Sequence, residues 1–484
     1  MTLGRFSLVS FFSCCFAASL LAQTVDDALR YSFVYPEGTA RFSATAGAIT
    51  PLGIDFSVAS TNPAGLGWAR RNSINLSLGT QTTDLQTRLL NGVDNEPEVE
   101  NRTRFNLPAV GAVFAGSTRS LNWPTLNFAI GVNRLADFNE VLQLQGRSSG
   151  SLVQTFADDA NAGIFNDFRN ELGFETDAIL QDDEGFFTDF ESNPDGQILR
   201  GGTVARSGSV NELSLSVAGS YKDVVMWGLS MGIPFARFEE IRDYEEVDEF
   251  NQILNFDDLA FLEELSVNGT GVNFKLGVII RPTQAVRVSL AAHTPTFWTF
   301  TENYKTTFTY NFTLDDGSLG GGTALSPESD FSYNLQTPWR FLAGIGVVAG
   351  RKGFVGLDID YSSFQNNQFS YEDFTVEADA VNEDIQALLT SSLGLRLGGS
   401  LNLDPLQLSA GIGMRQSAIA GDNENYMQYG LGAGYRFGNF FLDLAYQYRT
   451  RPDIFQPYPD NFVPQQFELD YREHHITLSA GLQF

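Results

Sequence analysis

Hydrophobic and polar residues alternate with a period of two along most of the chain beyond residue 72. The first such run places Ile74, Leu76 and Leu78 between polar or small residues. Because successive side chains of a strand point to opposite faces, this pattern predicts an all-β chain built of repeated hairpins. Fourteen runs qualify as strands: 72–88, 102–117, 124–146, 209–222, 224–247, 262–282, 285–311, 333–349, 353–375, 390–403, 406–419, 425–437, 439–450 and 468–484.

The connections between these runs differ in a regular way. Every second link is a tight turn, as at 222–223 and 438–439, whereas the intervening links are long and polar. The long links include 147–208, 312–332, 376–389 and 451–467. Short turns at one rim and long loops at the other are typical of outer-membrane barrels. Residues 72–484 are therefore predicted to form a 14-stranded antiparallel transmembrane β-barrel whose short turns face the periplasm.

The positions of the charged residues test which side chains of each strand face lipid and which face the lumen, because a charged side chain on the lipid-facing side of a barrel is costly. In the last strand Ile476 and Leu478 would face lipid, and the chain ends on Phe484, which resembles the signal read by the barrel assembly machinery. The same alternation places a mostly basic set in the lumen, where it could attract an anionic headgroup. The candidates are Arg287, His293, Arg340, Arg396, Arg415 and Arg436. Alternatively, these residues pair with lumenal aspartates and plug residues and keep the lumen neutral.

One run, 124–146, breaks the rule. With Leu126 facing lipid, the same parity would carry four later residues into lipid: Arg134, Glu140, Leu142 and Leu144. Either a bulge or kink between 133 and 140 turns the charges away, or this stretch lies above the bilayer. Both alternatives are open from the pattern alone.

Composition narrows the function. The chain has 58 Asp and Glu against 30 Lys and Arg, a formal net charge of -28, which argues against a nucleic-acid partner. Its two cysteines, Cys14 and Cys15, lie in an apolar leader, so neither a disulfide framework nor a thiolate metal site is expected. Residues 1–22 have the pattern of a signal peptide, and no later run is long and apolar enough for a membrane helix. No cofactor and no metal are predicted.

Residues 23–71 lack sustained alternation and are rich in Gly, Ala, Ser and Thr. A segment of this length without its own core cannot be an independent domain, so it is predicted to lie in the lumen as a hatch or plug. Within it stands the motif Asn62, Pro63, Ala64 and Gly65. Asn before Pro favours a turn, proline fixes φ and glycine permits positive φ, so the motif forms a rigid corner.

Several segments, in this order, resemble the FadL/OmpP1/TodX family of outer-membrane transporters of hydrophobic compounds, in its Bacteroidetes-like form. They are Ala40-Arg41-Phe42, Asp55-Phe56-Ser57, Asn62-Pro63-Ala64-Gly65-Leu66, residues 133–139, residues 292–296 and Thr337-Pro338-Trp339-Arg340. The resemblance implies a gating hatch at 62–65 and passive uptake of long-chain fatty acids or other hydrophobic compounds. It also implies a kinked third strand, whose gap would release ligand sideways at Arg134, Ala136, Asp137, Phe138 and Asn139.

In that family the extracellular loops capture the ligand. The candidates in the 147–208 loop are four apolar residues at roughly helical spacing: Phe156, Ile164, Phe165 and Phe168. Alternatively, they form an amphipathic helix packed on neighbouring loops. Residues 157–195 hold twelve Asp and Glu and one basic residue, and such clusters repel carboxylates unless Ca²⁺ or lipopolysaccharide-bridging cations neutralise them. A fatty acid is therefore not assumed as the ligand.

The expected partners are hydrophobic small molecules, outer-membrane lipid and lipopolysaccharide, for a monomer in the outer membrane of a Gram-negative bacterium. An enzyme is disfavoured, because the chain has three histidines, no Gly-x-Ser-x-Gly elbow, and adjacent His474 and His475 that point to opposite strand faces. Two alternatives to uptake are kept. A general porin for polar solutes would have an open lumen, and a barrel that scaffolds a secretion or surface-assembly partner would co-purify with another envelope protein.

Overall fold

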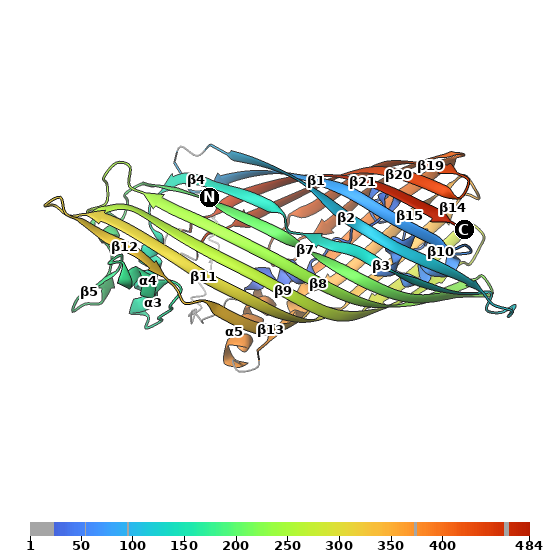
Figure 1. Cartoon of the computed structure of the whole chain (residues 1–484), viewed down its shortest axis with the longest axis horizontal. Coiled ribbons are helices and arrows are strands. Elements are labelled where there is room, and N and C mark those ends of the chain that lie inside the picture. Colours follow the sequence, from blue (N-terminus) through green and yellow to red (C-terminus); the bar gives the residue numbers. More distant parts are fainter. Residues whose placement is uncertain (1–23, 54, 94–95, 372–374, 459–463) are drawn as a thin grey trace, which may run out of the picture.

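The computed structural model describes residues 24–53, 55–93, 96–371, 375–458 and 464–484. Its main sheet closes on itself, because the first strand pairs with the last from Ser73↔Gln483 to Leu89↔Phe467 (Figure 1). The wall has fourteen strands, four of which are interrupted and appear as two segments each. The predicted fourteen-stranded antiparallel barrel is confirmed. The predicted signal peptide, 1–22, falls outside the described residues.

The bounds of the wall strands are as follows. They are β1 (Ser73–Leu89), β2 (Glu98–Ser117), β3 (Thr125–Asp137) continued by β4 (Glu140–Ser148), β7 (Ile198–Tyr221), β8 (Val225–Val247), β9 (Phe256–Ile280), β10 (Val286–His293) continued by β11 (Phe297–Thr313), β13 (Ser329–Gln336) continued by β14 (Arg340–Val348), β15 (Gly353–Ser363) continued by β16 (Gln368–Ser370), β17 (Ser391–Leu403), β18 (Leu406–Gln416), β19 (Asn425–Phe437), β20 (Phe440–Phe455) and β21 (Phe467–Gln483). A further strand, β12 (Leu319–Leu325), forms a hairpin with β11.

The two rims differ as predicted. Tight turns at 222–224 and 438–439 join β7 to β8 and β19 to β20, and the turn residues Lys222 and Gly438 have positive φ values of 52° and 61°. The opposite rim carries the long loops, including the one between β4 and β7. That loop ends earlier than the predicted boundary at 208, because β7 begins at Ile198. In an outer-membrane barrel the long-loop rim faces the cell exterior.

The outer surface of the barrel is apolar. Leu431 is 61% exposed, Leu276 is 57% exposed and the terminal Phe484 is 55% exposed, whereas the inward neighbours Lys275 and Ser479 are buried. The predicted phase of these strands is therefore confirmed. An apolar band on the outside of a closed barrel is what a bilayer requires, since closure leaves no unpaired strand edge in lipid.

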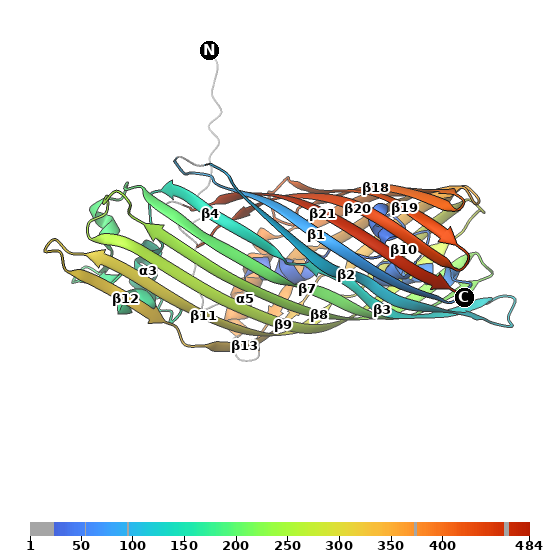
Figure 2. The same ribbon diagram turned by 45° about the horizontal axis from the view of Figure 1, so that its top comes forward.

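The wall is much taller on one side. β7, β8 and β9 have 24, 23 and 25 residues, whereas β18 has 11. Figure 2 shows the long strands running to the end opposite the C-terminus. The long loop folds there into α3 (Leu152–Asn161), α4 (Asn170–Glu175), the short strands β5 (Leu180–Gln181) and β6 (Phe186–Phe187), and the 3-10 helix η3 (Asp189–Ser192).

The N-terminal segment lies inside the barrel. It forms α1 (Val25–Ser32), α2 (Ala40–Ala44) and the 3-10 helices η1 (Phe56–Ser60) and η2 (Pro63–Trp68), and most of its side chains from residue 36 onward are buried. α1 packs on the helix α5 (Thr375–Leu388), which follows the 3-10 helix η4 (Phe364–Asn366) and β16. Among the described residues, none of the helices has the length and apolarity needed to cross a bilayer.

Candidate functional site: a cavity in the barrel lumen

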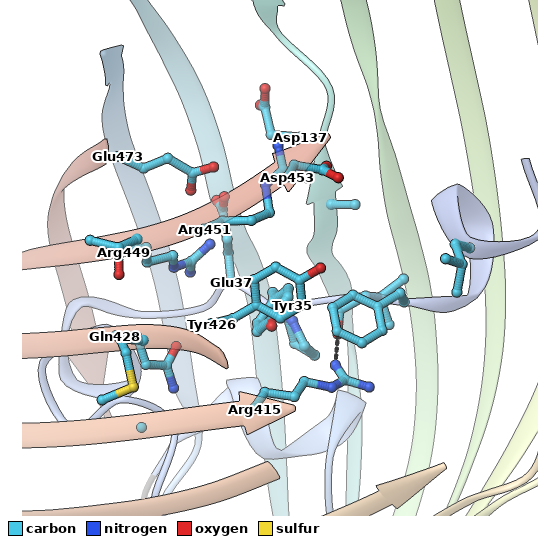
Figure 3. Close-up of a pocket in the computed structure, with 18 of the residues that line it drawn as sticks. Tyr35, Glu37, Asp137, Arg415, Tyr426, Gln428, Arg449, Arg451, Asp453 and Glu473 are labelled. Carbon is cyan, nitrogen blue, oxygen red and sulfur yellow. Dashed lines mark hydrogen bonds between the residues drawn. The ribbon is translucent and has the colours of Figure 1, made fainter. Parts of the chain in front are cut away.

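A cavity of about 320 Å³ lies in the lumen between the N-terminal segment and the wall. Residues 33–37 form one side of it, residues 136–140 at the junction of β3 and β4 form another, and the long-loop ends of β18, β19 and β20 complete it. Figure 3 shows the rings of Tyr35 and Tyr426 between Arg415 on one side and Arg449 on the other. The lining thus combines aromatic rings with guanidinium groups, which suits an amphipathic guest.

Two of the predicted headgroup candidates in this cavity already share a carboxylate partner. The Arg340 Nε donates to Asp360 at 2.8 Å, and the Arg396 Nη2 donates to the same carboxylate at 3.2 Å. Asp360 is itself buried. For this pair of arginines, the alternative that lumenal charges serve to keep the lumen neutral is the better description.

Arg415 and Arg449 are different. The Arg415 Nη1 donates to the Val34 carbonyl at 3.0 Å, and its guanidinium lies 4.0 Å from the Phe33 ring centroid. The Arg449 Nη2 donates to the Gln447 side chain at 2.7 Å. Within the described part of the chain, no carboxylate lies within 4.0 Å of either guanidinium. These two cations are therefore available to an anionic group in the cavity.

The other three headgroup candidates lie outside the cavity. The Arg287 Nη1 donates to the Leu52 carbonyl at 3.0 Å, and the His293 Nε2 lies 2.6 Å from the Thr61 carbonyl oxygen. Arg436 is ion-paired to Asp443 at 3.8 Å. The prediction of their lumenal side is correct. Their predicted role as headgroup ligands is not supported, because two of them hold the N-terminal segment and the third is paired on the wall.

The third wall strand is interrupted between residues 133 and 140, where its alternation pattern predicted a bulge or kink. The register between β3 and β7 shifts between Arg134 and Ala136, which leaves Leu135 as a bulged residue, and the strand breaks again before Glu140. The change of phase turns Glu140 inward, where it is ion-paired to Arg206 at 2.8 Å. Arg134 keeps its outward parity but is ion-paired to Asp137. The predicted outward orientation of Leu142 and Leu144 is wrong, since both are buried beyond the bulge.

The bulge leaves a gap in the hydrogen-bonded wall. β3 pairs with β2 only from Ala109↔Asn133 to Ser117↔Thr125, so the edge of β2 over 98–108 faces no paired strand in the described structure. Side chains cross this gap, as the Arg102 Nη1 donates to the Glu140 carbonyl at 3.2 Å and, further toward the long-loop rim, the Thr87 hydroxyl donates to the Gln143 carbonyl. From the lumen side, the Glu37 backbone N–H donates to the Arg134 carbonyl at 2.9 Å. Burial raises the pKa of the Glu37 carboxyl above its usual range.

The corner motif lies near the short-turn rim, away from the cavity. The Asn62 side chain accepts a hydrogen bond from the Ala64 N–H at 3.1 Å and caps η2. Two wall glycines let its backbone lie directly on the wall: a Cβ on Gly228 would be 2.3 Å from the Pro63 carbonyl carbon, and one on Gly277 would overlap the Asn62 side chain. The predicted corner is thus a capped 3-10 helix packed on the wall, in which Gly65 does not take the positive φ that glycine permits, and its gating role stays a prediction.

A buried polar cluster anchors the segment just before this corner. The Lys275 Nζ donates to Glu212 at 2.5 Å, and both side chains are almost fully buried. The Ser60 hydroxyl donates to the other Glu212 oxygen at 3.0 Å and accepts from the Asn133 amide at 2.8 Å. The hatch is therefore fixed to β7, β9 and the residue that precedes the kink.

The extracellular mouth is filled by a large apolar cluster. α3 contributes Leu152, Val153 and Phe156, which pack on inward residues of the tall wall such as Leu142 and Phe308. We call the folded segment 149–197 the lid. Of the four capture candidates, Phe156 is fully buried, Ile164 and Phe168 are half-buried, and Phe165 is 52% exposed. The predicted capture surface is wrong for Phe156, because the helix packs on its neighbours, and it stays a prediction for Phe165.

One arginine ties the lid to two distant segments. Arg200 is fully buried and its Nη1 donates to Glu246 at 2.6 Å and to the Tyr458 hydroxyl at 2.7 Å. Its Nη2 donates to the Ser149 carbonyl at 2.8 Å. The same Glu246 accepts from the Leu152 N–H at 3.1 Å, at the start of α3.

Replacing this arginine should loosen the lid without removing the barrel from the membrane. In Arg200→Met the buried Glu246 loses its cation, a change that typically costs about 3–5 kcal/mol. We expect faster proteolytic cleavage within 149–197 in limited proteolysis of the membrane-embedded protein. Arg237→Met is the matched control, because Arg237 pairs with Glu239 on the exposed surface of β8 and such pairs contribute little. Equal cleavage rates of both variants would contradict the role of Arg200 in holding the lid in place.

Sequence reasoning missed several residues of the cavity. Arg451, Tyr35, Glu37 and Tyr426 line it, and none of them was a candidate. No local signal marks them, since their proximity depends on how the N-terminal segment runs through the lumen.

Comparison with known proteins supports the architecture. No family model matches the chain, and no curated protein matches it in sequence. Among solved structures, a FadL homologue of Pseudomonas aeruginosa aligns with a TM-score of 0.55 and 12% identity, over 94% of this chain and all of that one. The toluene transporter TodX of P. putida aligns at 0.51 and 12%, over 93% and 99%. The toluene transporter TbuX of Ralstonia pickettii aligns at 0.50 and 12%, over 93% and 100%.

A closed fourteen-stranded barrel with an apolar outer surface and an N-terminal segment in its lumen places the chain among outer-membrane β-barrels. Within that class its fold is that of the FadL homologue and the TodX and TbuX transporters, which it matches over nearly its whole length. At identities of 12% this likeness concerns the fold.

Proposed function

We propose that the chain is an outer-membrane channel for the passive uptake of hydrophobic or amphipathic small molecules, long-chain fatty acids among them. In this proposal the ligand leaves the lumen sideways, through the gap between β2 and β3. A lateral exit suits such a ligand, since an apolar solute gains nothing by entering periplasmic water. The hatch around 62–65 keeps the axial route to the periplasm closed.

The observation that carries the proposal is the way the cavity meets the wall. Along β1, residues of a single parity line the cavity, as Gln81 and Thr83 do. At the kink, each of the residues from 136 to 140 lines it. The interrupted stretch of the third wall strand therefore lies between the cavity and the unpaired edge of β2, which places the cavity next to the gap. TodX and TbuX, which share the fold, are toluene transporters, and this supports a hydrophobic ligand.

Closing the gap chemically should stop uptake. The chain's two cysteines, Cys14 and Cys15, lie in the predicted signal peptide, so Arg102→Cys with Glu140→Cys introduces thiols on the two sides of the gap that are the only ones after residue 22. We expect a short bismaleimide that joins them to reduce palmitate uptake by whole cells to the level of cells without the channel. The measurement is uptake of radiolabelled palmitate in a Gram-negative host that lacks its own fatty-acid channel.

A second pair of cysteines serves as the control. Phe114→Cys with Phe128→Cys places thiols on facing residues of β2 and β3 where the wall is already hydrogen-bonded. Joining this pair should leave uptake unchanged. Lateral release is contradicted if joining the pair across the gap also leaves uptake unchanged, while the unmodified protein transports palmitate.

A further inference from the structure

The lumen cavity reaches the outer surface at a second place, four wall strands away from the kink. At the long-loop ends of β18, β19 and β20, residues of both parities line it. They include Met414 and Arg415 of β18, Tyr426 and Met427 of β19, and Ile454 and Phe455 of β20. By the alternation of side chains, the cavity passes around a strand edge here as well.

The strand pairing explains why an edge is available. β19 begins at Asn425, and its last pair with β20 is Met427↔Thr450. β20 continues to Phe455 along β21, so its other edge over 451–455 has no paired strand in the described structure. The hairpin of β18 and β19 ends nearer the membrane than β20 does, so this hairpin and the free edge of β20 border an opening. We call it the β20 window and define it by Met414, Ile419, Met427 and Ile454.

The side chains of the β20 window form an apolar collar in front of two free cations. Ile454 is 59% exposed and Ile419 is 38% exposed, although both line the cavity. Behind them lie Arg415 and Arg449, the two of the cavity-lining arginines that have no carboxylate within 4.0 Å in the described part of the chain. A collar of this kind admits an alkyl chain, and the cations behind it attract an acidic headgroup.

The aromatic residues of the neighbouring wall place the window on the extracellular side of the membrane interface. On the outer face of β19 and β20, the rings of Tyr429 and Tyr448 are stacked with centroids 6.3 Å apart, and outward aromatic residues mark the interfaces of outer-membrane barrels. Ile454 is six residues further along β20 toward the long-loop rim. The axial mouth at that rim is filled by the apolar core of the lid.

We propose that the β20 window is the entry site, through which an acidic amphiphile passes from the outer surface of the membrane into the lumen cavity. The proposal rests on the uptake function proposed above. Entry at the window and exit at the β2 edge would lead the ligand behind β20, β21, β1 and β2, with its headgroup passing Arg415 and Arg449. The lid then need not open for uptake.

Two measurements test this. Ile419→Trp with Ile454→Trp narrows the window, and we expect it to lose most of the palmitate uptake rate in whole cells while remaining a folded barrel. Leu325→Trp is the control, since Leu325 is 70% exposed on β12 and does not line the cavity. In parallel, the purified wild-type barrel is irradiated with a diazirine-bearing palmitate, which should label the peptides that carry Met414, Met427 and Ile454.

The proposal is overturned if the folded double variant transports palmitate at the wild-type rate, or if the label falls on the lid and not on the window peptides. If the double variant does not fold, the labelling of the wild type decides alone. A wild-type barrel that takes up no palmitate would contradict the proposed function. The labelling is measured in detergent without transport, so the two failures are distinguishable.

Discussion

Removal of residues 24–69 is expected to convert a closed barrel into an ion-conducting pore. This segment fills the lumen between the short-turn rim and the cavity, and a barrel of fourteen strands is wide enough to conduct water once emptied. Reconstituted in planar bilayers, the truncated protein should give stepwise single-channel currents, whereas the full chain should be silent or nearly so.

The point variant Asn62→Ala is the appropriate control for this deletion. It removes one capping hydrogen bond, a loss of about 1 kcal/mol, and leaves the lumen filled. It should therefore stay closed in the same bilayer experiment. A truncated barrel that is folded but silent would show that the lid alone seals the lumen.

The second large effect concerns the buried ion pair that holds the hatch. Lys275→Met leaves Glu212 buried without its cation, and breaking such a pair from one side costs about 3–5 kcal/mol. We expect a clear drop in the urea concentration at which the protein loses the electrophoretic mobility of the folded barrel. The size of the loss reflects an uncompensated charge in a site closed to water.

Removing both charges should restore much of this stability. In Glu212→Gln with Lys275→Met the amide can still accept from Ser60, and no buried charge is left alone. Recovery in the double variant identifies the lost stability as the cost of the lone carboxylate. If Lys275→Met alone is as stable as the wild type, Glu212 must take up a proton in the folded state, and the pair does not anchor the hatch.

The wall could be predicted from the sequence because successive residues of a membrane-spanning strand alternate between the lipid face, which must be apolar, and the lumen face, which can be polar. Outward rows such as Leu431 and Tyr435 and inward charges such as Lys275 follow from parity alone. The same rule fails beyond a single extra residue. One bulged position at Leu135 reverses the phase, which is why Leu142 and Leu144 were placed on the wrong face while the need for an interruption was recognised.

The contents of the lumen were much harder to predict. Parity assigned His293 and Arg287 to the correct side of the wall, but their partners Thr61 and Leu52 come from a segment without periodic pattern. Whether a lumenal arginine is free or paired depends on that segment and on neighbouring strands. Arg415 and Arg340 look alike in sequence, and only the second has an aspartate beside it.

The buried Arg200 also sets an order of assembly. Its partners come from residues 148–150, from Tyr244 and Glu246 of β8, and from Tyr458, which lies within the last tenth of the chain. These hydrogen bonds can therefore be completed only after the chain has passed β20, and the apolar cluster under the lid also includes Phe467, Leu469 and Tyr471 of β21. Resistance of the lid to protease then reports that the barrel has closed, because a chain stalled before its last strand would leave part of this cluster uncovered.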